Sequence, residues 1–325
     1  MGEANARYYA KGQALGASGD FVTAPEISQM FGELIGAWCA DLWQRAGQPG
    51  RVQWVELGPG RGTLAADAGR VMARAGFKPT VHFVEASPGF RKRLEAEALD
   101  DAHFHDSLAS VPRDGPVLVV ANEFFDALPI RQLVRTPAGW RERMVALDED
   151  DRFIFVAGAQ LMDAAVPAGL GDAPPSTIIE TCPAAVAIAR ELADRIAQSD
   201  GAALIIDYGH LEPRTGSTFQ AVRAHAKADP LEAPGQADLT AHVDFAALKA
   251  IAGAAGLRTA TTTQGAFLER LGITQRANAL VESAPERREE LAAAHRRLCS
   301  PEEMGALFKI LTMFHPDWPE PAGFG

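Results

Sequence analysis

Short apolar runs alternate with longer amphipathic segments along the first half of the chain. The runs are nearly continuous in apolar residues, as strands covered on both faces require, and they span residues 52–57, 81–85, 117–121 and 203–207. Between them, apolar residues recur at helical spacing and predict helices over residues 62–75, 88–98 and 183–198. This alternation predicts an α/β fold with a mostly parallel, doubly wound sheet flanked by helices.

Two segments interrupt the alternation. Residues 131–176 contain runs at 140–147 and 152–156 joined by the letters LDEDD, which predict an antiparallel hairpin inside an inserted, substrate-binding region. Residues 210–243 carry Pro213, Gly216, Pro230, Pro234 and Gly235, too many breakers for one regular element, and predict a long functional loop. The main domain is therefore expected to comprise residues 51–130 and 177–325.

The chain is expected to close with one more helix and two more strands. Asp244 is a candidate N-cap for the helical letters FAALKAIAGAAG. Runs at residues 259–263 and 308–314 predict the strands that complete the sheet.

The first 50 residues predict a helical segment. A helix is expected to begin near Pro25, because proline favours the first helical turn. Its apolar positions recur at helical spacing and predict core residues, which are Ile27, Met30, Phe31, Leu34, Ile35 and Trp38. Two interpretations stay open for this segment: a lid over a site, or simple packing against the domain.

Charge and cysteine usage narrow the class of protein. The 325 residues hold 31 Lys and Arg against 42 Asp and Glu, a net charge of −11, which argues against nucleic acid as a partner. Cys39, Cys182 and Cys299 are too few and too widely spaced for a disulfide framework or a zinc site, so we expect reduced thiols and no metal. We also expect no membrane span and no targeting peptide, since residues 1–19 lack the apolar core of a signal.

A glycine-rich turn follows the first predicted strand. In VQWVELGPGRGTL, Glu56 ends the strand and Gly58, Pro59, Gly60 and Gly62 form the turn before a helix. A dinucleotide fingerprint needs glycine where Thr63 stands, so a pyrophosphate-binding turn is disfavoured. The spacing instead favours close approach of a ligand to the backbone, with Glu56 receiving a cationic ammonium such as that of a sulfonium nucleoside. The alternative is a tight turn without a ligand.

Acids after the next strands extend this prediction. Glu85 stands at the end of the second strand, where doubly wound folds place an acid that accepts hydrogen bonds from ribose hydroxyls. Asp106 and Ser107 follow the third strand and are candidates for contact with an adenine amino group. For Asp106, a solvated surface position is an equal alternative.

These residues are typical of class I S-adenosylmethionine (SAM) methyltransferases, and three longer motifs sharpen the match. The motifs are GDFVTAPEISQMFGELIGAW from Gly19, ANEFFDALPIRQ from Ala121 and PGQADLTAHVDF from Pro234. Together they resemble the mitochondrial dysfunction protein A family, whose mitochondrial members are protein arginine methyltransferases needed for assembly of respiratory complex I. Family members usually carry a longer segment before GDFVTAPEIS, of which MGEANARYYAKGQ looks like the tail.

The resemblance implies SAM as cofactor and symmetric dimethylation of arginine in a complex I subunit or its bacterial equivalent. The chain looks most like bacterial members, which implies the cytoplasm. The implied partner is a protein substrate, such as a subunit of an NADH:quinone oxidoreductase. Because a guanidinium stays protonated at neutral pH, such a reaction needs carboxylates close to the methyl group.

Glu123 and Asp126 are the leading catalytic candidates, because ANEFFDALP begins at the carboxyl end of a strand, where doubly wound folds bind ligands. Asn122 is a candidate for orienting the cofactor, and Asp207 ranks third because it ends another strand. Structural alternatives are a helix N-terminal acid for Glu123 and a cap or ion pair for Asp126. Phe124 and Phe125 are expected in the core, as adjacent aromatic residues usually are.

Other functions remain open at this stage. Fold and cofactor do not select the acceptor, so a small-molecule methyltransferase is one alternative. Another is a SAM-binding assembly factor with little turnover. His210, His225 and His242 are each expected to be structural.

Overall fold

The computed structural model describes residues 1–9, 22–97, 101–167, 169–223 and 226–325. Its largest sheet has the strand order β3-β2-β1-β4-β9-β15-β14, with β13 paired to β9. Neighbouring strands from β3 to β9 run parallel, whereas β15 is antiparallel to both β9 and β14. The strands of this sheet are β1 (Gln53–Leu57), β2 (Thr80–Val84), β3 (His103–His105), β4 (Val117–Asn122), β9 (Gly201–His210), β13 (Val243–Asp244), β14 (Arg258–Thr263) and β15 (Phe308–Phe314).

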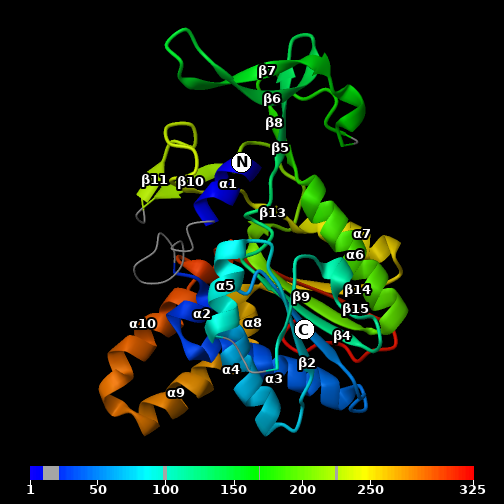
Figure 1. The fold of residues 1–325 in the computed structure, drawn as a ribbon, viewed down its shortest axis with the longest axis vertical. Helices are drawn as coiled ribbons and strands as arrows, with labels where there is room; N and C mark the ends of the chain where they lie inside the picture. Colours follow the sequence, from blue (N-terminus) through cyan, green and yellow to red (C-terminus); the bar gives the residue numbers. More distant parts are fainter. Residues whose placement is uncertain (10–21, 98–100, 168, 224–225) are drawn as a thin grey trace.

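Helices cover both faces of this sheet (Figure 1). Trp54 and Val55, neighbours on β1, point to opposite faces and enter two separate apolar cores. The first core includes side chains of α3, α4 and α8–α10, and the second those of α6 and α7. The helices are α1 (Gly2–Tyr9), α2 (Ala24–Ile27), α3 (Gln29–Arg45), α4 (Thr63–Arg74), α5 (Pro88–Glu97), α6 (Pro183–Ser199), α7 (Phe245–Ala254), α8 (Gln264–Arg270), α9 (Ile273–Ser283), α10 (Arg288–Cys299) and α11 (Met304–Leu307).

The predicted α/β fold with its mostly parallel sheet is confirmed. Apart from the helix expected from Pro25, each predicted strand and helix is present and differs only at its ends, although Ala98 lies outside the described residues. Asp244 caps α7 as expected, since its side chain accepts a hydrogen bond from the Ala247 N–H at 3.0 Å. The helix expected from Pro25 is divided, because Ser28 is extended and caps α3 by accepting from the Met30 N–H. Of the predicted core residues here, only Ile27 is not fully buried.

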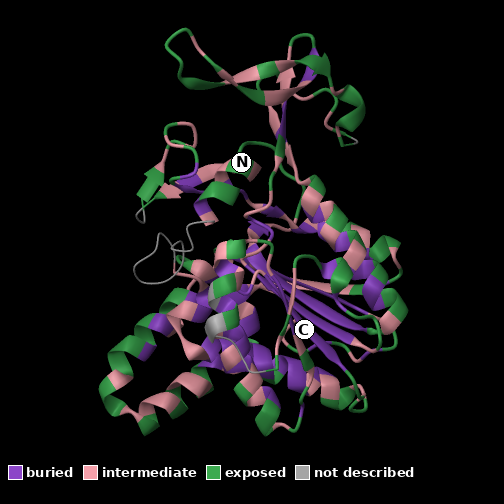
Figure 2. Ribbon diagram, in the orientation of Figure 1, coloured by how far each residue is buried: buried purple, intermediate pink, exposed green. Residues whose placement is uncertain are grey.

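The inserted segment forms a separate four-stranded antiparallel sheet with the order β7-β6-β5-β8. Its central hairpin is the predicted one, and it projects away from the main sheet as an arm (Figure 1). The buried residues of the main sheet contrast with this arm, which is mostly exposed or half-buried (Figure 2). Its strands are β5 (Arg131–Thr136), β6 (Gly139–Leu147), β7 (Phe153–Leu161) and β8 (Ile178–Thr181).

The long loop predicted for residues 210–243 is wrong in part. This segment contains a three-stranded sheet of order β11-β10-β12, made of β10 (Gln220–Arg223), β11 (Ala226–Ala228) and β12 (Asp238–Thr240). Of the proline and glycine residues that argued against regular structure, Pro213 and Gly216 precede β10, whereas Pro230, Pro234 and Gly235 lie between β11 and β12. The proline and glycine residues therefore mark the turns that bound several short strands, and they do not exclude regular structure from the whole segment.

Helices α8 to α11, between β14 and β15, were not predicted. In the described part of the chain, no helix is long and apolar enough to span a membrane.

Candidate active site

A cavity of about 400 Å³ opens at the carboxyl ends of β1, β2 and β4. This is the edge where the chain order of the sheet reverses, since β2 lies on one side of β1 and β4 on the other. Predicted site residues that line the cavity are Glu56, Gly58, Pro59, Gly60, Glu85, Asn122 and Glu123. The structure therefore brings these seven predicted residues together at one cavity.

At the glycine-rich turn after β1, the backbone borders the cavity without covering side chains. Gly58, Gly60 and Gly62 have φ values of 63°, 56° and 76°, a region that favours glycine. A Cβ atom on Gly58 would lie 2.8 Å from the Phe124 ring, so this position has no room for a side chain. Gly62 caps α4 and is not among the residues that line the cavity.

Glu56 is a buried acid with an unsatisfied oxygen. It is 3% exposed, and its Oε2 atom has no hydrogen-bond partner among the described residues. Because burial removes water from the carboxylate, the pKa of Glu56 rises to about 8. Such a group has an unfilled requirement for a cation or a donor on the ligand.

Glu85 is half-buried, and its carboxylate accepts a hydrogen bond from the Ser87 N–H at 2.7 Å. Burial raises its pKa. Glu85 lines the cavity at the carboxyl end of β2, and its contact with a ribose stays a prediction.

Asn122 and Glu123 form the opposite wall. The Glu123 carboxylate accepts hydrogen bonds from the Ala24 N–H at 2.9 Å and from the Asn122 amide at 3.1 Å. The Asn122 Oδ1 atom is buried without a partner in the described structure. Desolvation raises the pKa of Glu123 to about 7. Glu123 has φ 50° and lies in a bend, with no helix in the described segment between β4 and β5, so it is not a helix N-terminal acid.

Asp207 and Asp126 do not line the cavity. Asp207 is fully buried and accepts hydrogen bonds from the backbone N–H groups of Phe125, Asp126 and Tyr208, at 3.0, 3.2 and 2.9 Å. These bonds hold the bend that carries Glu123. Asp126 is also buried, which raises its pKa to about 6.

Asp106 and Ser107 follow β3 as expected but do not line the cavity. The Asp106 side chain is 84% exposed and forms an ion pair with Arg91 of α5. The geometry therefore favours the solvated surface position for Asp106, because its ion-pair partner Arg91 does not line the cavity.

Comparisons with known proteins agree with this geometry. Residues 34–263 match a family described as "Putative S-adenosyl-L-methionine-dependent methyltransferase". The protein arginine methyltransferase NDUFAF7, mitochondrial, of Danio rerio is 38% identical over 95% of this chain and 79% of its own length; the human protein is 36% identical over 94% and 76%. The chain belongs to the NDUFAF7 family of SAM-dependent methyltransferases. The family resemblance, the enzyme class and the cofactor predicted from the motifs are thereby confirmed.

A crystal structure of a Burkholderia thailandensis protein bound to S-adenosyl-homocysteine has a TM-score of 0.82 to this methyltransferase. It is 30% identical and covers 96% of this chain and 84% of that chain. A second structure from the same organism has a TM-score of 0.79 and 31% identity, covering 98% and 90%. The fold is therefore that of a SAM-dependent methyltransferase.

The residues of the cavity fit the family's cofactor. SAM carries an ammonium, a ribose and an electrophilic sulfonium methyl. The unpartnered Glu56 oxygen can accept from the ammonium, Glu85 from the ribose hydroxyls, and the turn at Gly58 and Gly60 admits the ligand next to the backbone.

The N-terminal segment, for which a lid over a site was one of two interpretations, supplies part of the cavity wall, through residues that the sequence did not single out. Asn5 and Tyr9 of α1 line it, with Thr23, Pro25 and Glu26 near α2. The Thr63 hydroxyl donates to the Glu26 carboxylate, so the residue that breaks the dinucleotide fingerprint bonds to α2. The motif GDFVTAPEIS was the available signal, although its residues Gly19 to Phe21 lie outside the described residues.

Phe90 and Phe124 also line the cavity, and Phe124 packs against the second core, in which Phe125 is buried. His210 and His242 do not line it, and His225 lies outside the described residues.

Proposed function

We propose that this methyltransferase transfers methyl groups to arginine side chains of a protein and forms symmetric dimethylarginine. The observation that carries the proposal is the Glu123 carboxylate, fixed at the cavity wall by the Ala24 N–H and the Asn122 amide. The names of the curated relatives, protein arginine methyltransferases, support the same acceptor.

SAM, when bound, supplies a methyl group that leaves as its sulfonium becomes a neutral thioether. Glu123 accepts N–H hydrogen bonds from the guanidinium and orients one nitrogen towards the reacting carbon. The positive charge of the guanidinium favours the ionised form of this carboxylate, whose pKa of about 7 would otherwise leave it partly protonated near neutral pH. After attack, Glu123 is placed to take the nitrogen's proton. Asp207, through the backbone of residues 125–126, keeps the carboxylate in position.

We assign the arm formed by β5 to β8 to the binding of the protein substrate. Among described residues, most exposed large apolar side chains lie on this arm: Met144, Val145, Leu147, Phe153, Ile154 and Leu161. Leu147 pairs with Phe153, and Val145 with Phe155, on one face of the hairpin, whereas Ile154 pairs with Ala146 on the other. Both faces are apolar at the outer end, which is unusual for an antiparallel ribbon in water.

Charge favours a basic client over a second copy of the chain. The turn at the tip of the hairpin carries Asp148, Glu149, Asp150 and Asp151. Two copies would bring two such turns and two chains of net charge −11 together. A client with an apolar patch beside arginine or lysine residues complements the arm.

The client that the motif resemblance implies is a subunit of respiratory complex I or of the equivalent bacterial NADH:quinone oxidoreductase. The resemblance to bacterial members implies that the enzyme acts in the cytoplasm. The curated relatives named above are mitochondrial proteins.

The decisive experiment uses purified enzyme, methyl-labelled SAM and lysate from cells that lack the gene. Protein is hydrolysed and the labelled amino acid identified. Label in symmetric dimethylarginine supports the proposal and yields a labelled band from which the client is found. Label only in small metabolites would assign a small-molecule substrate, and no label despite SAM binding would assign an assembly factor.

A further inference from the structure

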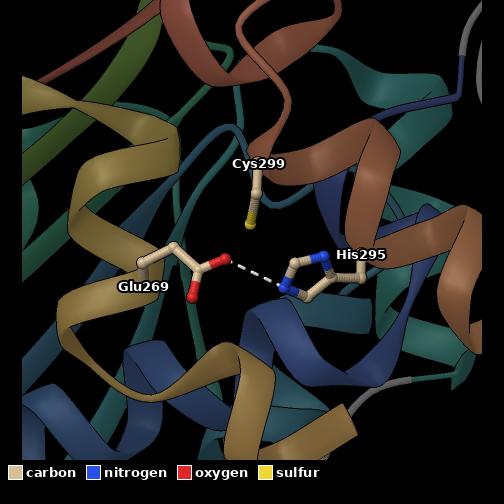
Figure 3. A group of neighbouring side chains, drawn as sticks. All are labelled: Glu269, His295 and Cys299. Carbon is tan, nitrogen blue, oxygen red and sulfur yellow. Dashed lines mark ion pairs between the residues drawn. The ribbon is translucent and has the colours of Figure 1, made fainter.

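Three potential metal ligands meet away from the cofactor cavity, between α8 and α10. Glu269 lies in the last turn of α8, and His295 and Cys299 lie one turn apart on α10 (Figure 3). Their ligand atoms all lie within 4.8 Å of one another. None of the three lines the cavity described above.

The side chains already point at a common centre. The Glu269 Oε1 atom lies 2.9 Å from the His295 Nε2 atom, and the Cys299 sulfur faces the space between them (Figure 3). Thr274 donates to the Glu269 Oε2 atom at 2.8 Å and lies 3.0 Å from the same His295 nitrogen. The Thr274 bond to Oε2 leaves Oε1 facing His295, and such an outer contact orients a ligand carboxylate. The Thr274 contact with Nε2 gives way when that nitrogen binds the ion.

Close backbone packing fixes the cysteine. A Cβ atom on Gly265 would lie 2.4 Å from the Cys299 carbonyl oxygen, and one on Gly305 would lie 2.0 Å from it. The Gln264 amide donates to the Leu298 carbonyl at 2.9 Å. The carboxyl end of α10 is thus held against the start of α8 and against α11, so little ordering remains to be done when a ligand binds.

The chemistry of the three groups selects the ion. A thiolate, an imidazole and a carboxylate together suit Zn²⁺, whereas Mg²⁺ and Ca²⁺ prefer oxygen ligands alone. A dication balances one thiolate and one carboxylate, which leaves a partly buried site neutral.

We propose that Glu269, His295 and Cys299 bind a zinc ion, with water completing a tetrahedral set, and that this ion joins α8 to α10. The sequence pattern was overlooked because a helical His-x-x-x-Cys pair has only two ligands, and the third comes from a different helix. The competing interpretation is a plain His295–Glu269 ion pair supported by Thr274.

The first test measures metal in the purified full-length chain and then replaces it with Co²⁺. We expect about one equivalent of zinc or cobalt per chain. Bound Co²⁺ should give the sulfur-to-cobalt charge-transfer absorption of a thiolate ligand. Cys299→Ser should abolish this absorption, and Cys182→Ser, which alters a half-buried thiol outside the cluster, should leave it unchanged.

A second readout needs no variant. Co²⁺ should protect Cys299 from alkylation, as followed by mass spectrometry of the wild-type protein, and should leave the labelling of Cys182 unchanged. Chelation should lower the melting temperature of the wild-type chain, and added Zn²⁺ should restore it. Absence of charge-transfer absorption in the wild type, its persistence in a folded Cys299→Ser chain, or Cys299 alkylation that Co²⁺ does not slow would overturn the proposal.

Discussion

At the residue scale, Glu123 carries the clearest test of the chemistry. Glu123→Gln keeps the shape of the side chain and removes its charge. We expect turnover to fall by about 10²- to 10⁴-fold, because the guanidinium loses the carboxylate that orients it and takes its proton. SAM affinity, measured by calorimetry, should stay within about twofold, since Glu56 and Glu85 supply the cofactor contacts proposed above.

The pH profile refines this prediction. Since the active form of Glu123 is ionised and its pKa is about 7, kcat/KM of the wild type should rise with pH up to about 7. The matched control is Glu282→Gln on α9, an exposed position away from the cavity, which should change neither turnover nor its pH profile. Undiminished turnover in Glu123→Gln would remove Glu123 from the active site.

Replacing Glu56 is expected to raise the stability of the cofactor-free chain and to weaken SAM binding. Its pKa rises on folding from 4.5 to about 8, so the folded chain holds a proton that the unfolded chain has lost. The cost of burying this acid is absent below about pH 4.5, grows as pH rises towards 8, and is then fully present. Glu56→Gln should therefore stabilise the cofactor-free chain at about pH 9 by at least about 1 kcal/mol and change little at about pH 4.

Denaturant unfolding of wild type and variant at both pH values measures this difference. The same substitution should weaken SAM binding by about tenfold or more, because it removes the acceptor for the ammonium. A variant less stable than the wild type at high pH would show that Glu56 is not an unpaired buried acid.

Single residues also show where sequence reasoning stops. Glu56, Glu85 and Glu123 could be placed because parallel strands end at one edge of the sheet. Asp207 ends a strand at that same edge, yet its side chain bonds to backbone N–H groups below the cavity. Asp106 turns to Arg91. Strand position predicts the layer in which a side chain begins, but not its direction or its competing partners.

At the element scale, Gly58 in the turn between β1 and α4 and Gly76 in the turn between α4 and β2 form a matched pair. Gly58 and Gly76 both have positive φ, 63° and 80°, so alanine at either should cost about 1–2 kcal/mol of stability. Only at Gly58 does an added Cβ meet a neighbour, the Phe124 ring at 2.8 Å; at Gly76 nothing lies within 4 Å. Gly58→Ala should weaken SAM binding by about tenfold or more, whereas Gly76→Ala should leave it unchanged.

Thermal unfolding of both variants measures the cost of alanine at a positive φ. Calorimetry of SAM binding then measures the further effect of the Cβ contact with Phe124, which only Gly58→Ala introduces. Equal affinities in two equally destabilised variants would mean that the turn does not shape the cofactor site.

Elements were predictable where one pattern dominated. The strands of the main sheet have almost no competing interpretation, because they are apolar on both faces. The strands β10 to β12 are only three or four residues long, and their short apolar patterns were obscured by the turns between them. Helices α8 to α10 follow β14 as an added layer whose packing partners, including α3 and α2, lie far away in sequence. Their joint arrangement, and with it the Glu269, His295 and Cys299 cluster, could only be seen in three dimensions.

At the scale of the whole molecule, the assignment proposed above places substrate binding on the arm and the chemistry at the cavity. The cavity lies at the edge of the main sheet, and β5 leaves this edge a few residues after Glu123 (Figure 1). A client held on the arm therefore stays attached to the segment that carries the proposed catalytic acid. This arrangement predicts that changes at the tip of the arm affect a large protein substrate and spare a short peptide.

The paired substitution Leu147→Ser with Phe153→Ser tests this separation. The two residues are cross-strand partners, 56% and 45% exposed, so their replacement should not unfold the hairpin. For the protein client, KM should rise by about tenfold or more, because an apolar contact is lost, while kcat and SAM affinity stay unchanged. A short peptide around the methylated arginine should show unchanged kcat/KM. Leu307→Ser, at a 46% exposed leucine on α11, is the control and should affect neither substrate. Equal losses for protein and peptide would show that the arm shapes the catalytic site itself, and unchanged kinetics for both would remove the arm from substrate binding.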